Sequence, residues 1–223
     1  TATLVVYVLA QGAYTRLRQA PWANPVLWTV VVLAGVLLAT GIEYPVYFAG
    51  AQFIHFLLGP AVVALGWPLW QRRDALRQRW GRLLLAALAG GVAASGSALA
   101  LGWALGLPAD VLLSLAPKSV TAPVAMGIAE KIGGIPALAA VFAVITGLVG
   151  ALSGKYLFDA LRIPTTLHGF MSRGFALGTA SHGIGAARAL QVDADAGAYA
   201  GLALGLQVVL ASLLMPLAFR LLG

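Results

Sequence analysis

The sequence predicts an all-α fold, a polytopic helical membrane protein with about seven spans and a re-entrant, broken-helix hairpin. Of the 223 residues, 61% are hydrophobic and only 9% are charged, and the mean hydropathy is +0.91. Soluble domains carry charges on about a quarter of their residues. The apolar runs 26–40 and 137–149 do not alternate with polar residues, as the strands of a membrane β-barrel would. We therefore expect one integral membrane domain over residues 1–223.

The charged residues, cysteines and histidines exclude several classes of function. The net charge of +7 does not indicate nucleic-acid binding, because five arginines fall between residues 72 and 82, where a cytoplasmic loop accounts for them. The chain has no cysteine, so disulfides and thiol chemistry are excluded. Three separated histidines make a poor ligand set, so we expect no metal and no cofactor. With no catalytic triad, no nucleotide-binding loop and only short polar loops, we do not expect an enzyme.

The first half of the chain, residues 1–107, is expected to hold four spans, at 1–11, 26–42, 51–70 and 83–107. The first residues lack the basic start of a cleavable signal peptide, so we expect a span there. The third span is expected to be interrupted at Gly59 and Pro60, because proline lacks a backbone donor and clashes with the preceding turn. The fourth is rich in small residues, which let membrane helices pack closely.

The second half, residues 108–223, is expected to hold a re-entrant segment at 111–131 and spans at 137–152, 174–190 and 196–222. The re-entrant segment contains Pro117-Lys118-Ser119-Val120-Thr121-Ala122-Pro123, in which two prolines bracket a lysine and two hydroxyl groups. Broken backbone at membrane depth is tolerated only inside protein or beside a wet cavity. If this segment enters and leaves on one side, the basic loop at 153–173 is cytoplasmic and the acidic turn at 191–195 is outside, as the positive-inside rule favours.

A second polar interruption is expected at Gly178-Thr179-Ala180-Ser181-His182-Gly183-Ile184-Gly185. We expect the two interruptions to face each other and to form one small polar site. Residues 58–62 also resemble 121–125, and interrupted helices at corresponding places are typical of inverted-repeat transporters. Because Gly-Pro pairs are common in apolar chains, this similarity between residues 58–62 and 121–125 could also have arisen by chance.

The predicted site can bind a small carboxylate. Its predicted substrate-binding residues are Lys118, Ser119, Thr121, Thr179, Ser181 and His182. The residues expected to shape the helix breaks are Gly59, Pro60, Pro117, Pro123, Gly178, Gly183 and Gly185. The lysine supplies positive charge, and the hydroxyl groups and helix starts supply donors.

Purely structural roles are the alternative interpretation of these residues. Lys118 could instead place its ammonium among lipid headgroups. His182 could exchange a proton near neutral pH, or it could be a neutral, buried ring bonded to backbone. The glycines could serve close helix packing, or they could expose backbone at the site.

Five stretches resemble the signature of the LrgB/CidB antiholin-like family: residues 56–61, 113–125, 133–138, 145–147 and 176–185. The resemblance covers the chain from about Asn24 to its end. It implies a bacterial inner (cytoplasmic) membrane protein with multiple passes, surrounded by membrane lipid. It also implies a homo-oligomer such as a dimer, and a small LrgA-like membrane protein as a further partner. Many relatives carry an acidic residue where this chain has Gly127, and the nearby Glu130 could replace it.

The resemblance implies two functions. The plant plastidial member moves glycolate and glycerate, and bacterial relatives are associated with pyruvate. By this likeness the chain is expected to be a secondary transporter or facilitator of small monocarboxylates, with a small organic anion as its ligand. The alternative is a holin/antiholin-like membrane protein that regulates murein hydrolase export and autolysis. The polar interruptions favour transport, since a lesion-forming protein has no need of a small polar pocket.

Overall fold

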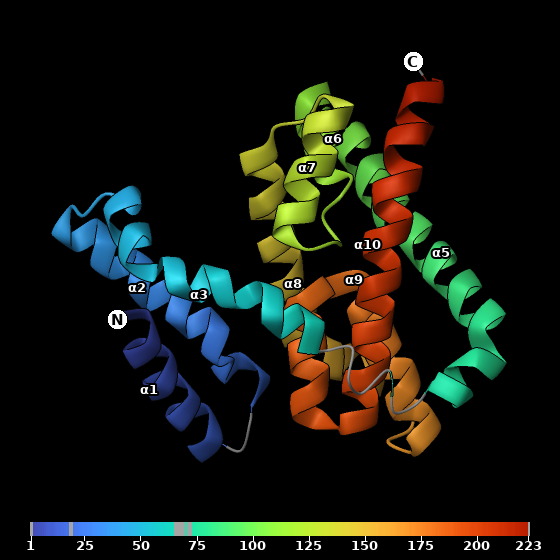
Figure 1. Cartoon of the computed structure of the whole chain (residues 1–223), viewed down its shortest axis with the longest axis horizontal. Coiled ribbons are helices and arrows are strands. Elements are labelled where there is room, and N and C mark those ends of the chain that lie inside the picture. The colour runs from blue at the N-terminus through green and yellow to red at the C-terminus, as the bar shows by residue number, and fades with distance from the viewer. Residues whose placement is uncertain (1, 18–19, 65–69, 71–72, 223) are drawn as a thin grey trace. The chain divides into compact units, whose positions relative to one another are not determined.

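The computed structural model describes residues 2–17, 20–64, 70 and 73–222, which are α-helical along most of their length (Figure 1). No strand occurs among these residues, so the all-α prediction is confirmed. The chain divides into two compact units, Thr1–Trp67 and Pro68–Gly223. The predicted single domain, with halves at 1–107 and 108–223, stays a prediction.

The first unit contains α1 (Ala2–Arg16), a short 3-10 helix (Pro21–Ala23), α2 (Pro25–Thr40) and α3 (Tyr44–Ala64). Asn24 begins α2 by accepting hydrogen bonds from the backbone N–H groups of Val26 and Leu27, at 2.9 and 3.2 Å. The side chain of Asn24 thereby satisfies donors that lack a partner inside the helix. Gly41, with φ +67°, ends α2 in the left-handed conformation.

Helix α3 corrects one prediction from the sequence. It runs without a break through Gly59 and Pro60, where an interruption was expected. A proline removes one backbone hydrogen bond, but in apolar helices the freed group can be satisfied locally and the helix continues. The sequence similarity between residues 58–62 and 121–125 therefore does not correspond to a pair of broken helices.

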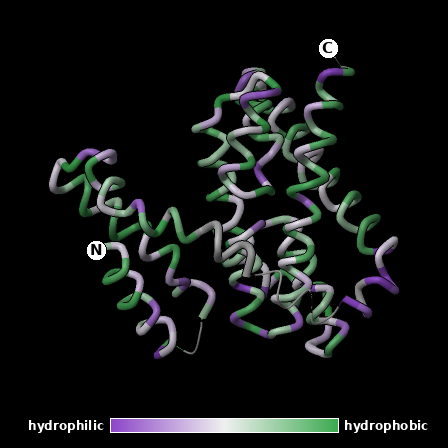
Figure 2. Tube along the Cα trace, in the orientation of Figure 1, coloured by the Kyte–Doolittle hydropathy of each residue, from purple (hydrophilic) through white to green (hydrophobic). Residues whose placement is uncertain are grey.

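The second unit contains α5 (Arg73–Ala104), α6 (Ala109–Leu115), α7 (Ala122–Ile132), α8 (Pro136–Ala160), α9 (Leu167–Val192) and α10 (Ala194–Leu222). The basic loop predicted at 71–82 is helical from Arg73, because arginine favours the helix nearly as well as leucine. Figure 2 shows the strongly hydrophilic residues of α5 gathered in its first turns. The loop predicted at 153–173 is also shorter than expected. It comprises residues 161–166, because α8 and α9 extend into the predicted range from either side.

Three described helices are long and apolar enough to cross a membrane, namely Arg77–Ala104, Pro136–Ala160 and Ala194–Leu221. Pro25–Thr40 is a shorter apolar helix. At a rise of 1.5 Å per residue, α6 and α7 are only roughly 10 and 16 Å long, too short to cross. The total of about seven spans stays a prediction.

Helices α6 and α7 form the expected re-entrant hairpin, here named hairpin 1. The chain passes Ser114 near the end of α6 and returns to it after α7. The hydroxyl of Ser114 accepts a hydrogen bond from the N–H of Ile135 at 2.7 Å, and Gly134 lies against the backbone of Leu113 and Ser114. Hairpin 1 therefore enters and leaves at the end of the unit where α8 begins.

Helix α9 is a second re-entrant hairpin, here named hairpin 2, where the sequence predicted a crossing. In a continuous helix, residues eight apart are about 12 Å apart. Here a Cβ on Gly185 would lie 2.6 Å from the carbonyl oxygen of Leu177, so the chain has reversed between them. The backbone is non-helical at Ser181 (φ −128°, ψ 19°) and His182 (φ 40°, ψ −137°).

The first half of α9 also runs parallel to α10. Gly174 and Gly178 lie against the backbone of Ala196 and Ala200, in the same order along both helices. A straight α9, followed at once by α10, would run antiparallel to it. Figure 1 shows α10 rising from the end of the unit at which α9 also begins.

The reversal corrects the predicted placement of the acidic turn. Asp193, which caps α10 by accepting from the N–H of Asp195 and Ala196 at 2.8 and 3.0 Å, lies at the same end as the loop 161–166. The sequence had placed these two segments on opposite sides, because the stretch 174–190 was counted as a crossing. A helical stretch long enough to cross can also fold back on itself when its middle leaves the helical conformation.

Candidate functional site

The tip of hairpin 1, residues 116–121, forms where two prolines prevent a continuous helix. Pro117 has no N–H group to extend α6. Pro123 lies in the first turn of α7, where a missing donor removes no helical hydrogen bond. Thr121 precedes α7 without a side-chain cap. The first N–H groups of α7 therefore lack partners within the helix, and the positive end of its dipole lies at the tip.

The tip of hairpin 2 contains no proline and depends on contacts with α8. The ring nitrogen Nε2 of His182 lies 2.7 Å from the carbonyl oxygen of Ala143. Because a carbonyl oxygen only accepts, Nε2 carries the proton and donates it. A side chain at Gly150 would collide with the hydroxyl of Ser181, and one at Gly147 would lie 2.7 Å from Nε2. These two glycines make room for the tip.

Both tips lie near the same part of α8, around Ala143. Ala143, whose carbonyl receives the His182 bond, packs its side chain in a buried cluster with Val120 of hairpin 1. The cluster also contains Ala125, Ala139 and Ala211. Both hairpins, which enter from opposite ends of α8, thus border the same stretch of its interior: hairpin 2 bonds to Ala143, and hairpin 1 shares a buried cluster with it.

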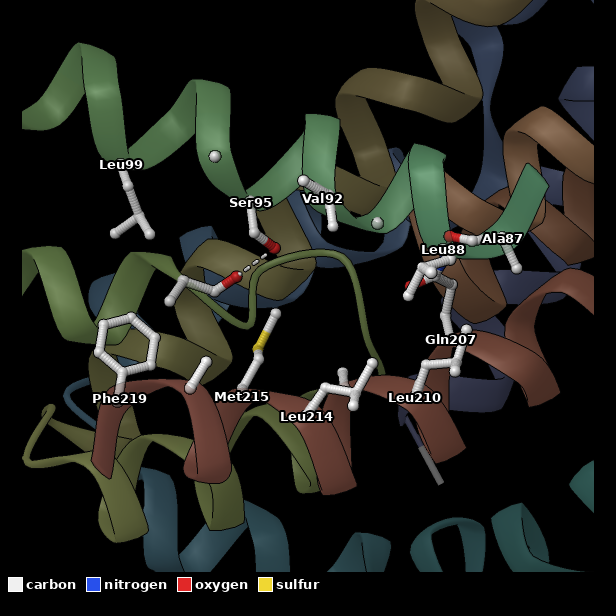
Figure 3. A pocket seen from close by; sticks show the side chains of 15 residues that line it. Ala87, Leu88, Val92, Ser95, Leu99, Gln207, Leu210, Leu214, Met215 and Phe219 are labelled. Carbon is white, nitrogen blue, oxygen red and sulfur yellow. Dashed lines mark hydrogen bonds between the residues drawn. The ribbon is translucent and has the colours of Figure 1, made fainter. Parts of the chain in front are cut away.

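Helix α5 contacts both tips from another side. The hydroxyl of Ser95 donates to the carbonyl oxygen of Ala116 at 2.9 Å, the bond dashed in Figure 3. The methyl group of Thr179 lies against Gly90. Gln207 of α10 donates to the carbonyl of Ala87, one turn earlier on α5. A polar layer therefore crosses the middle of an apolar bundle.

The predicted binding residues lie on the two tips as two separate sets. Lys118 is partly buried, and its Nζ donates to the hydroxyl of Ser119 at 3.3 Å. Ser119 is 5% exposed, and Thr121 is partly buried. Thr179, Ser181 and His182 are 6%, 2% and 4% exposed. In the described part of the chain no hydrogen bond joins the two sets, which are linked through α5 and α8.

The predicted shaping residues have different roles. Pro117 is fully buried at the tip of hairpin 1, whereas Pro123 is exposed. Gly178 and Gly185 lie where a side chain would meet backbone, which is the packing interpretation. A Cβ on Gly183 would meet no atom within 4 Å, so close packing does not explain that glycine. Gly59 and Pro60 belong to α3 of the first unit.

Several residues of this layer were missed by sequence reasoning: Gly90, Ser95, Ala143, Gly147, Gly150 and Gln207. Gly147, Gly150 and Gly154 recur every three or four residues, which places them on one face of α8. That spacing was the available signal for the surface on which hairpin 2 packs. Among the residues described, no group of three or more His, Asp or Glu side chains could hold a metal ion.

A cavity of about 240 Å³ lies beside the tip of hairpin 1, between α5 and α10 (Figure 3). Leu88, Val92, Leu210, Leu214 and Phe219 give it an apolar lining. Such a lining offers no counter-charge to a carboxylate, so this cavity is not the predicted anion site.

The helical fold, the apolar candidate spans and the paired hairpins define an α-helical membrane protein with two breaks in the helices of its second unit. The chain belongs to the LrgB-like family, whose model matches residues 3–221. It is 35% identical to the uncharacterized protein YxaC of Bacillus subtilis, over 96% of this chain and 91% of that protein. It is 30% identical to the holin-like protein CidB of Staphylococcus aureus, over the same shares of the two chains. No solved structure matches the chain significantly.

Proposed function

We propose that this protein controls the passage of solutes across the bacterial cytoplasmic membrane, and that the path runs between the tips of hairpins 1 and 2. The observation that carries the proposal is the pair of helix breaks that approach Ala143 from opposite ends of α8, hairpin 2 by a hydrogen bond and hairpin 1 through a shared buried cluster. Helix breaks that meet in the interior of a membrane protein are typical of substrate and ion sites. Two versions of this function differ in the size of the solute.

The first version is a secondary transporter or facilitator of small monocarboxylates. Its support is the tip of hairpin 1, where an ammonium group, hydroxyl groups and the positive end of α7 lie close together. Lys118 would attract the carboxylate, and Ser119 and the first N–H groups of α7 would donate to its oxygens. Ser181 and His182 would line the opposite side. A small organic anion is the ligand that this set of donors suits.

The second version is a holin-like protein that regulates murein hydrolase export and autolysis. The comparisons support it better than the first version, because CidB of Staphylococcus aureus and of Staphylococcus epidermidis is named holin-like and no relative named above refers to carboxylates. This version predicts large assemblies and a wide path. A homo-oligomer, and a small LrgA-like partner in the same membrane, belong to both versions as proposals.

Reconstitution into sealed vesicles distinguishes the two versions. Vesicles carry trapped fluorescent dextran and are given labelled glycolate, pyruvate or glycerate outside. The transporter version predicts saturable uptake of the acids, retention of the dextran, and loss of uptake in Lys118→Ala. Lys131→Ala is the matched control, because this exposed lysine lies at the far end of α7.

The holin-like version predicts loss of the trapped dextran and no saturation with acid concentration. Uptake that Lys118→Ala leaves unchanged would contradict the transporter version even if the dextran stays inside.

A further inference from the structure

A second cavity, of about 620 Å³, lies between the first turns of α5 and the first half of α9. It is larger than the apolar cavity and more polar in its lining. The residues that line it are Arg79, Arg82, Leu83, Ala86, Gly90, His168, Met171, Ser172, Phe175, Ala176, Thr179, Ala180 and Tyr199. Its lining extends from the first turns of α5 and α9 to Thr179 and Ala180.

Two arginines in the first turns of α5 give this cavity positive charge. Arg79 and Arg82 line it, and neither forms an ion pair with a residue that the structure describes. No aspartate or glutamate is among the described lining residues. Lys155 of α8 and Arg173 of α9 differ from these arginines, because both form ion pairs with Asp159, at 2.7 and 2.9 Å. Cavities lined by one sign of charge concentrate counter-ions and raise their rate of association.

The inner end of the cavity leads to hairpin 2. Thr179 lines it, is 6% exposed, and has a hydroxyl oxygen without a hydrogen-bond partner. A buried hydroxyl without a partner is unfavourable unless a water molecule or ligand satisfies it. Thr179 lies two residues before Ser181, where hairpin 2 reverses. The cavity therefore joins two arginines to the tip that the proposed solute path uses.

We propose that this cavity is the cytoplasmic receiving site for a small oxyanion, with Arg79 and Arg82 attracting it and Thr179 donating to it at the inner end. The assignment to the cytoplasmic side follows the concentration of arginines at this end. The inference rests on the proposed function for its role in transport. The ligand chemistry fits a free carboxylate or the headgroup of an anionic lipid, and we assign the site to the free carboxylate.

The absence of native cysteine allows a direct test of the cavity. Ala176→Cys places a thiol on the exposed lining residue one turn before Ala180. Its rates of labelling by an anionic and a cationic methanethiosulfonate are compared in vesicles of phosphatidylcholine, from each side. Thr165→Cys, in the loop 161–166 and outside the cavity, is the reference thiol. Ser172→Cys replaces Ala176→Cys if that variant does not fold.

The expected result is a preference for the anionic reagent at Ala176→Cys that exceeds the preference at Thr165→Cys. The double variant R79Q/R82Q should lower this preference at least about threefold, because the field of both guanidinium groups is lost. R77Q is the matched control, since Arg77 is an exposed arginine of α5 outside the cavity. Equal preferences in R79Q/R82Q and R77Q would overturn the proposal, as would labelling from the opposite side alone.

Protection experiments identify the source of the oxyanion. Millimolar glycolate should slow labelling of Ala176→Cys in phosphatidylcholine vesicles. If glycolate has no effect and labelling slows only when phosphatidylglycerol is added to the vesicles, the site binds lipid and the assignment to a free carboxylate is wrong.

Uptake measurements separate this inference from the proposed function. If the protein is a carrier, R79Q/R82Q should raise the half-saturating concentration of labelled glycolate while the maximal rate is retained. If no variant transports glycolate but the anion preference persists, the carrier function fails and the receiving site stands. If uptake is normal and unaffected in R79Q/R82Q, with no anion preference, the receiving site fails and the carrier function stands.

Discussion

Hairpins 1 and 2 both pack near Ala143 of α8, but they reverse the chain by different means. Hairpin 1 uses six residues between two helices, with Pro117 preventing the first helix from continuing. Hairpin 2 reverses at Ser181 and His182, with no proline and with a positive φ at a histidine. The proline restricts the backbone locally and causes the break in hairpin 1. Contacts with α8 stabilise the break in hairpin 2. The comparison predicts that hairpin 2 depends more strongly on its neighbours.

The largest effect is expected where α8 makes room for hairpin 2. In Gly150→Ala, the new methyl group would overlap the side chain of Ser181, so either the tip or α8 must move. Overpacking of this kind costs about 1–3 kcal/mol. Thermal unfolding in detergent, followed by tryptophan fluorescence, should show a clearly lower midpoint.

Gly96→Ala is the matched control for this change. Gly96 also lies inside a long helix, α5, but a Cβ there would meet no atom within 4 Å. Alanine is favoured over glycine in a helix by up to about 1 kcal/mol, so this variant should be as stable as the parent or more stable. A midpoint that falls equally in both variants would show that the tip of hairpin 2 does not need the space at Gly150.

A smaller effect is expected from the backbone of His182. Its φ of 40° and ψ of −137° are rarely adopted by residues with a side chain, and such strain costs about 1–3 kcal/mol. His182→Ala and His182→Gly both lose the bond to Ala143, but only glycine relieves the strain. We expect His182→Gly to be the more stable of the two by about 1 kcal/mol.

The measurement is the denaturant midpoint of both variants in mild detergent. Glycine also raises the conformational entropy of the unfolded chain, which by itself would make His182→Gly the less stable variant. A higher midpoint for His182→Gly is therefore a stringent sign of relieved strain. If His182→Ala is the more stable variant, the reversal at His182 carries no appreciable strain and hairpin 2 resembles hairpin 1 more closely than proposed.

The smallest effect is expected from the contact between α5 and hairpin 1. Ser95→Ala removes the hydrogen bond to the carbonyl of Ala116 and should lower stability by about 1 kcal/mol. Ser97→Ala is the control, because its exposed hydroxyl contacts only the carbonyl of Ala94 in its own helix. The difference between the two unfolding midpoints measures how far hairpin 1 relies on α5. Equal unfolding midpoints in the two variants would indicate that the prolines of hairpin 1 hold its conformation without the contact to α5.

The sequence predicted the site more completely at hairpin 1 than at hairpin 2. At hairpin 1, the two prolines and Lys118 indicated both the break and its polar content, and the chain returns to Ser114 as a re-entrant segment. At hairpin 2, the glycines and Ser181-His182 indicated an interruption but not its direction. The interruption predicted at Gly59 and Pro60 was wrong, because one proline within a helix does not fix whether the helix ends.

Composition and local patterns alone determined that this chain is an all-α membrane protein and that its helix breaks after α6, because a low charge content and a missing backbone donor act wherever they occur. Only the tertiary structure decided that α9 folds back on itself and that both tips pack near Ala143. The physical reason is that the conformation of Ser181 and His182 is unfavourable by itself. It is held by the space above Gly147 and Gly150 and by a hydrogen bond to a residue 39 positions away.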